Sequence, residues 1–208
     1  MTTIEIQAIA STTVRGNYVN YSVARATSTS YANTETYLNV GQFYYTTPAY
    51  SVWRHFLCFD TSSIPDGAIV NRAYLRMALR GKNTSNGSFY VYIRKQDWSA
   101  QYPISDSNRE TAYDNCLAAT TDNTFIQVTS STALNTYYDS GDLDVSRINK
   151  TGYTYYSLIS SPDVNNSPPP SNYGNIASVF AYNNASYPPL LVVEFSGIAR
   201  INYVPIIG

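Results

Sequence analysis

Apolar and polar residues alternate along most of this chain, and a period of two is typical of β-strands with one buried face. In residues 73–80, AYLRMALR, every odd-numbered position is apolar, and in residues 88–95, SFYVYIRK, Phe89, Val91 and Ile93 repeat the pattern. The intervening GKNTSNG has glycine at both ends, which is typical of a turn. The two segments are therefore predicted to form an antiparallel hairpin with one buried face.

The segment 52–60, VWRHFLCFD, is apolar on both faces of its predicted strand. Such a strand is covered on both sides, so we expect it at the centre of the fold. It leads into TSSIPDG, where Pro65 and Gly67 occupy positions that are favoured in a turn. Asp60, at the end of the strand, is expected to accept hydrogen bonds from nearby backbone or hydroxyl groups.

The remaining segments with strand character complete an all-β chain. They are residues 3–9, 34–41, 124–130, 152–160, 177–183 and 190–197, with one short helix expected around 109–119. Short strands separated by turns at regular intervals predict an antiparallel β-sandwich or barrel. A proline-rich stretch, 160–175, is expected to be a surface loop. We predict a single domain over residues 1–208, with its core at about 14–195 and an apolar tail at 196–208 that docks on the domain or on a neighbouring subunit.

Composition changes this picture mainly through tyrosine and charge. The chain has 21 tyrosines, whereas charged residues make up only 13% of it and the formal net charge is −1. Tyrosine favours strands and also interfaces, where its ring is buried and its hydroxyl stays hydrated. Weak charge repulsion suits association with copies of the same chain or with a larger assembly. No basic patch appears, so the sequence argues against nucleic acid as a partner.

The N-terminal residues, MTTIEIQAIASTT, lack the basic start and the long apolar core of a signal peptide. No segment is apolar over the length needed to span a membrane, so no membrane partner is expected. We expect synthesis and folding in a cytoplasm, where Cys58 and Cys116 would be free thiols. A disulfide between them is the alternative.

Candidate catalytic residues are few. His55 is the only histidine, and it falls inside the strand predicted for 52–60. It is expected to be a packed side chain with a hydrogen-bond partner, and a catalytic triad is the alternative. Cys58 lies on the opposite face of that strand, so the two side chains cannot pair. The four glutamates are scattered, which argues against the carboxylate pair of a glycosidase, and we predict neither enzymatic activity nor a cofactor.

One acidic turn is a candidate metal site. DSGDLD places carboxylates at Asp139, Asp142 and Asp144, and oxygen ligands at such a spacing can hold calcium. The alternative is a charged turn that leads into a strand at LDVSRI. We favour the turn and predict no bound metal.

Surface aromatic residues are the main binding candidates. They lie on the outward face of the strand predicted for 88–95 and in the segment QFYYTTPAYSVW, and are Tyr44, Tyr45, Tyr50, Trp53, Tyr90 and Tyr92. Rings of this kind either stack on sugar rings or fill an oligomer interface. Their spread along the chain favours the interface, with a polysaccharide as the alternative ligand.

The stretch RHFLCFDTSSIPDGAIVNRAYLRMAL resembles the DNRLRE-type domains, which are also classed among carbohydrate-binding modules. The residues that carry the resemblance are Arg54, Phe59-Asp60, Ser62-Ser63-Ile64-Pro65 and Ala73-Tyr74-Leu75. Upstream, YANTETYLNVG is similar to a strand of that family, and downstream YPPLLVVEF is similar to its closing strand, so the likeness spans about Val14 to Phe195. The resemblance implies a jelly-roll-like antiparallel β-sandwich in which these residues are scaffold.

Relatives of this type include polysaccharide-binding modules beside enzymes and parts of phage virions or cell-surface proteins, so the resemblance implies either role. A module that stands alone favours the virion. We predict a non-enzymatic virion structural protein, either a phage capsid decoration, a head-fibre or a tail-associated subunit. It would assemble as a homo-oligomer, for example a trimer, with other virion proteins. The alternative is an extracellular or cell-surface carbohydrate-binding module or adhesin that binds polysaccharide through surface aromatics.

Overall fold

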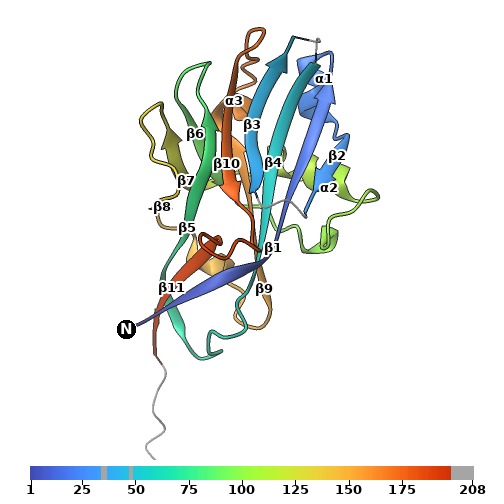
Figure 1. Cartoon of the computed structure of the whole chain (residues 1–208). Coiled ribbons are helices and arrows are strands. Elements are labelled where there is room, and N and C mark those ends of the chain that lie inside the picture. The colour runs from blue at the N-terminus through green and yellow to red at the C-terminus, as the bar shows by residue number, and fades with distance from the viewer. Residues whose placement is uncertain (34–36, 47–48, 198–208) are drawn as a thin grey trace, which may run out of the picture.

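The computed structural model describes residues 1–33, 37–46 and 49–197. These residues form an antiparallel β-sheet of eleven strands (Figure 1). The strands are β1 (Thr2–Tyr18), β2 (Ser30–Ala32), β3 (Tyr37–Tyr45), β4 (Ala49–Asp60), β5 (Ile69–Asn83), β6 (Phe89–Arg94), β7 (Thr121–Val128), β8 (Tyr137–Asp139), β9 (Tyr153–Ser160), β10 (Gly174–Phe180) and β11 (Leu190–Ser196). The helices are α1 (Tyr21–Ala26), α2 (Arg109–Ala118) and α3 (Ser161–Val164), with 3₁₀ turns η1 (Ser99–Gln101) and η2 (Val145–Arg147). The predicted single-domain antiparallel β-sandwich is confirmed.

Strand β4 lies at the centre of the sheet. One of its edges pairs with β1 from Ala8 to Tyr18, and the other is shared by β3 near the start of β4 and β9 near its end. From β3 the pairing continues through β10, β5 and β11 and returns to β1, so these strands close a circuit. From β9 the pairing continues through β6 to β7. Because β1 and β5 change partners along their length, the sheet bends around its core.

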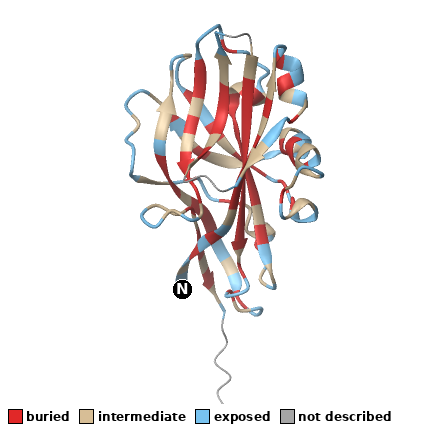
Figure 2. Ribbon diagram, turned by 45° about the vertical axis from the view of Figure 1, so that its right-hand side comes forward, coloured by how far each residue is buried: buried red, intermediate tan, exposed pale blue. Residues whose placement is uncertain are grey.

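The main hydrophobic core contains the apolar side chains that the alternation assigned to the inner face. Leu75 and Met77 of β5 are completely buried, and Phe89 of β6 is nearly so. From β4, Leu57 and Phe59 point into the same core. Figure 2 shows buried residues concentrated in the strands, with the exposed ones gathered in the turns and the outer helices.

A second core lies on the opposite face of β4, beneath α1 and α2. Phe56 and Cys58 of β4 pack there against Tyr113 and Cys116 of α2. Strand β4 is therefore covered on both faces, as its sequence predicted. Helix α1 lies so close to β1 that a Cβ atom at Gly16 would come within 1.9 Å of a backbone oxygen of α1.

The hairpin predicted between residues 73–80 and 88–95 is wrong. Within the described part of the chain, β5 pairs with β8, β10 and β11, whereas β6 pairs with β7 and β9. Strand β10 pairs with β5 from Leu79 to Asn83, next to the turn where a hairpin partner would lie. Both β5 and β6 still bury their predicted inner faces in the main core. Alternation therefore gave the buried face of each strand but not its neighbour.

The proline-rich stretch at 160–175 is more ordered than predicted. Strand β9 ends at Ser160, α3 follows at once with Pro162 in its first turn, and β10 begins at Gly174. The fixed φ of proline suits the first turn of a helix. Asp163 is completely buried, so part of this stretch lies inside the protein. The strand expected at LDVSRI, residues 143–148, is also wrong, because Val145–Arg147 form η2 and the flanking residues are not in a strand.

The two ends of the described chain lie together. Thr2 pairs with Phe195, and the described chain stops at Gly197, at the same end of the molecule as the N-terminus (Figure 1). The apolar tail predicted at 196–208 starts here. Its residues 198–208 lie outside the described residues, so its docking stays a prediction.

Candidate functional site

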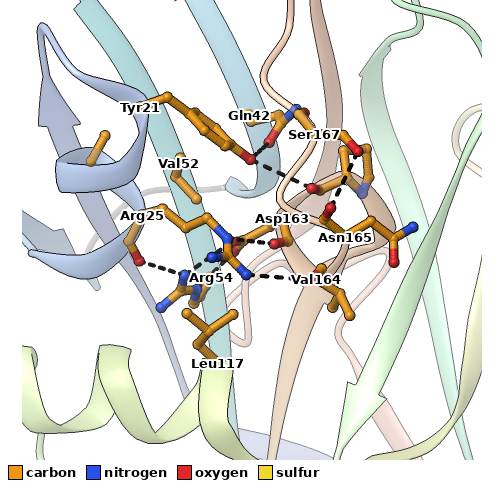
Figure 3. A network of polar contacts seen from close by, with 12 residues as sticks. Tyr21, Arg25, Gln42, Val52, Arg54, Leu117, Asp163, Val164, Asn165 and Ser167 are labelled. Atoms are coloured by element: carbon orange, nitrogen blue, oxygen red, sulfur yellow. Dashed lines mark hydrogen bonds and ion pairs between the residues drawn. The ribbon is translucent and has the colours of Figure 1, made fainter.

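A buried ion-pair network joins β4 to the helices on its outer face (Figure 3). The side chains of Arg54 in β4 and Asp163 in α3 are completely buried. Arg54 donates from Nε to Asp163 Oδ2 at 2.8 Å and from Nη2 to Oδ1 at 3.0 Å. From α1, Arg25 Nε donates to the same Oδ1 at 3.1 Å. One carboxylate therefore binds two arginines that come from different elements.

The other donors of Arg54 reach backbone carbonyls. Its Nη1 donates to the oxygen of Tyr113 at 2.7 Å, and its Nη2 donates to that of Arg25 at 2.8 Å. The guanidinium carbon also lies 3.8 Å from the centroid of the Tyr113 ring, a cation–π contact. Burial lowers the pKa of Arg54, but the charge of Asp163, its hydrogen bonds and the neighbouring Tyr113 together more than offset this and raise that pKa overall. The guanidinium therefore stays charged inside the protein.

Helix α2 is held by further side chains from the sheet. Arg94 donates to the carbonyls of Cys116 at 3.2 Å and Leu117 at 3.0 Å. Gln96 Nε2 donates to the oxygen of Ala112 at 3.0 Å. The last carbonyls of a helix lack partners within the helix, and its dipole favours a cation at that end. These contacts therefore fix α2 against β4 and β6.

The network continues from α1 to β3. The Tyr21 hydroxyl donates to Gln42 Oε1 at 2.5 Å, and Gln42 Nε2 donates to the oxygen of Ser167 at 2.6 Å. Burial raises the pKa of Tyr21, so its phenol stays neutral. The groups of this network bond to one another within the protein. The arrangement is suited to holding α1 and α3 in place.

The residues first considered for catalysis are packed in the interior. His55 is completely buried, with its Nδ1 3.2 Å from Thr13 Oγ1, which confirms the predicted packed histidine. Burial lowers the pKa of His55 to about 3. Cys58 and Cys116 are buried free thiols, and burial raises the pKa of Cys58 to about 12 and that of Cys116 to about 11. At neutral pH all three side chains are uncharged.

The acidic turn does not gather its carboxylates. Asp139 pairs with Arg76, Asp142 pairs with Arg72, and Asp144 pairs with Lys95. Each carboxylate is therefore held by a different cation. Across the described residues, no group of three or more His, Cys, Asp or Glu side chains is arranged to hold a metal ion.

Three of the aromatic candidates meet at the end of the molecule farthest from the N-terminus (Figure 1). Tyr44 of β3 and Tyr50 of β4 are paired across the sheet, and their ring centroids lie 4.2 Å apart in a stack. Tyr45 packs on Phe43 at 4.7 Å. We call this surface the tyrosine end, and it comprises Val19, Tyr44, Tyr45, Tyr50 and Tyr173.

Trp53 belongs to a different place, a pocket of about 310 Å³ beside β2. The Arg15 guanidinium lies 5.3 Å from the centre of the Trp53 ring and is held by the Ser51 hydroxyl at 2.6 Å. Tyr31 and Tyr37 supply two further aromatic rings to the pocket wall. The pocket thus combines aromatic rings with a positioned cation.

Tyr90 and Tyr92 form a third surface, on β6, with nearly parallel rings 6.1 Å apart. The six predicted aromatic residues are therefore divided among three surfaces. A further cluster escaped the sequence analysis. Trp98 of the segment after β6 meets Tyr102 at 5.8 Å and Tyr155 of β9 at 4.9 Å. Trp98 and Tyr102 are close in sequence, but Tyr155 comes from a distant strand, so no local pattern marks it as their neighbour.

Asp163, the centre of the buried network, was also missed. It lay in a stretch expected to be a surface loop. One feature of the sequence could have pointed to it. Asp163 is the only charged residue between Lys150 and Glu194. An isolated charge in an uncharged stretch needs a partner if it is buried, and Arg54 in an apolar strand was a matching cation.

No protein-family model matches this chain, and no curated protein matches it either. The resemblance to DNRLRE-type domains therefore rests on the motifs alone, and what is established is a largely antiparallel β-sheet protein. Within the described ranges, none of the helices has both the length and the apolar character that crossing a membrane requires.

Proposed function

We propose that this chain is a non-enzymatic structural subunit of a virus particle, a phage decoration, head-fibre or tail-associated protein that assembles as a homo-oligomer. One contrast carries the proposal. The side chains with reactive chemistry, His55, Cys58 and Cys116, are buried in packing contacts. Tyrosine rings, which suit protein contacts, are left partly exposed, as at Tyr45 and Tyr173.

Sequence and fold add two supports. The motifs from Arg54 to Leu75 resemble a domain type with relatives in phage virions. The described chain stops at Gly197, at the opposite end from the tyrosine end, so the apolar segment 198–208 follows from there (Figure 1). A subunit that attaches to the particle at one end and contacts other copies at the opposite end would suit the surface of a virus particle.

The proposal is tested first on particles. Virus particles are purified on a density gradient from the source of the gene, and their proteins are identified by mass spectrometry. We expect this chain in the particle band at a fixed ratio to the major capsid protein. Its presence only in the soluble fraction would contradict the proposal.

The apolar segment gives a second test. Deletion of residues 198–208 removes no residue of the described core, and circular dichroism checks that the fold is kept. The deletion should reduce binding to purified particles that lack the protein. The full chain is the control, and equal binding of both forms would contradict an attachment role for this segment.

A second candidate function, saccharide binding, is supported by the pocket beside β2. Aromatic rings stack on sugar rings, while groups such as the Arg15 guanidinium and the Asn39 side chain can bond hydroxyls. A glycan array tests this. Binding that is lost in Arg15→Gln and kept in Arg72→Gln, a change on a different surface, would support it, whereas an array without hits would remove it.

A further inference from the structure

The residues of the tyrosine end come from three stretches of the chain that contain no Asp, Glu, Lys or Arg. They are residues 16–24, 36–53 and 164–193. The fold brings them together, because Tyr50 pairs with both Tyr18 and Tyr44 across the sheet. The backbone N–H of Tyr44 donates to the oxygen of Tyr173 at 3.1 Å.

Three of the charged residues that flank these stretches turn inward. Arg25, Arg54 and Asp163 bond to one another in the buried network beneath the tyrosine end (Figure 3). The side chain of Arg25 keeps only 20% of its surface exposed, and the other two keep none. This network therefore holds these three charges largely away from the surface.

The same end exposes apolar and aromatic side chains. Val19 is 70% exposed, Tyr173 is 47% exposed and Tyr45 is 39% exposed. Depletion of charge together with enrichment in tyrosine distinguishes the centre of a protein interface from the rest of a surface. Tyrosine also contributes a large contact area at a small cost in side-chain entropy. The composition and the exposure of this end both match an interface.

We propose that the tyrosine end of one copy binds the tyrosine end of a second copy of this chain. The inference rests on the proposed assembly function and names its contact surface. An uncharged surface gives a charged partner no complementary group, whereas a second copy buries no unpaired charge against it. The phenol hydroxyl both donates and accepts, so tyrosines can bond to tyrosines. In cyclic symmetry the same end of every copy lies around one axis.

Charge placed on the tyrosine end tests the inference. Val19→Glu and Tyr173→Glu each put a carboxylate on an exposed position, so the folded chain should tolerate them. Each should weaken self-association by roughly 100-fold, because a carboxylate would be buried without a partner. Val19→Lys should act in the same way, since either sign of charge is unpaired there. Sedimentation velocity measures the change, and circular dichroism checks the fold.

Matched controls carry the same charge on other surfaces. Ile69 is 64% exposed and Tyr153 is 43% exposed, and both lie away from the tyrosine end. Ile69→Glu and Tyr153→Glu should assemble like the unmodified chain. If the unmodified chain assembles and Val19→Glu, Val19→Lys and Tyr173→Glu assemble equally well, this inference is overturned and the assembly function stands. If the unmodified chain is a monomer throughout, the assembly function itself fails.

Discussion

His55 is completely buried, and its Nε2 has no hydrogen-bond partner among the described residues. Water cannot solvate the imidazolium there, so burial depresses its pKa. The environment of this histidine was predictable, because alternation in β4 places it among large apolar side chains. The role of Asp60 was also predictable, because it ends the strand just before a run of hydroxyl-bearing residues. It accepts hydrogen bonds from the backbone N–H and the hydroxyl of Ser62 at 3.1 and 2.6 Å. The burial of Asp163 was not predictable from a local pattern, because its partners come from α1 and β4, which are far away in the sequence.

The dependence of stability on pH tests the state of His55. Its pKa is about 3 in the folded chain, whereas an exposed histidine has a pKa of about 6.5. Between these values the unfolded chain binds a proton that the folded chain does not. The free energy of unfolding should therefore fall as pH decreases below the upper value, by up to about 1.4 kcal/mol per pH unit. Urea unfolding at a series of pH values measures this slope.

The control for that experiment is His55→Gln, which removes the chain's only histidine. Between roughly pH 5 and pH 6.5 few other side chains titrate, so the slope should flatten in this variant. The carboxylates of Asp60 and Asp144, whose pKa values are lowered by hydrogen bonds, titrate at lower pH. An equal slope in the variant and the unmodified chain would show that His55 is not buried in its neutral form.

Helices α1, α2 and α3 are short, and tertiary contacts stabilise such helices more than their own propensity does. Local signals still mark two of them. Asn20 caps α1 by accepting from the backbone N–H of Ser22 at 2.9 Å, and Pro162 lies in the first turn of α3. The sequence pattern predicted only α2, near residues 109–119. Alternation marked the longer strands but not the three-residue strands β2 and β8. It also mispaired β5 and β6, because alternation carries no information about which strand lies alongside.

Removal of the central carboxylate should release these helices. Asp163→Asn leaves Arg54 buried without its counter-charge, and breaking a buried pair in this way costs about 3–5 kcal/mol. Thermal unfolding should show a large loss of stability. Asp142→Asn, which breaks an exposed pair, is the control and should change little. A mild effect of Asp163→Asn, comparable to that of the control, would contradict the role of the network.

The close contact between β1 and α1 gives another prediction. In Gly16→Ala the new Cβ would overlap the backbone oxygen of Ala24, so α1 must shift. Overpacking of this kind costs about 1–3 kcal/mol, which chemical denaturation can measure. Gly67→Ala is a matched control, because nothing lies within 4 Å of the corresponding position. Equal stability of the two variants would show that α1 does not pack as described.

The molecule as a whole has two different ends. The first and last described strands meet at one end, and the uncharged tyrosine end lies at the other (Figure 1). Composition predicted contact surfaces through its tyrosines and its low charge, but it did not reveal where they lie. Tyr44, Tyr45 and Tyr50 gather at the tyrosine end, whereas Trp53 faces a pocket. Tyr44 and Tyr50 lie in neighbouring strands, but Tyr18 and Tyr173 reach them from distant parts of the chain, which local patterns do not encode.

The mass of the full chain in solution tests the central claim most directly. Sedimentation equilibrium over a wide range of concentration measures it, with a single chain at 23.1 kDa as the reference. We expect a discrete multiple of that mass at micromolar concentration, with dissociation on dilution or when a charge is placed on the tyrosine end. A mass of one chain at every concentration would contradict it.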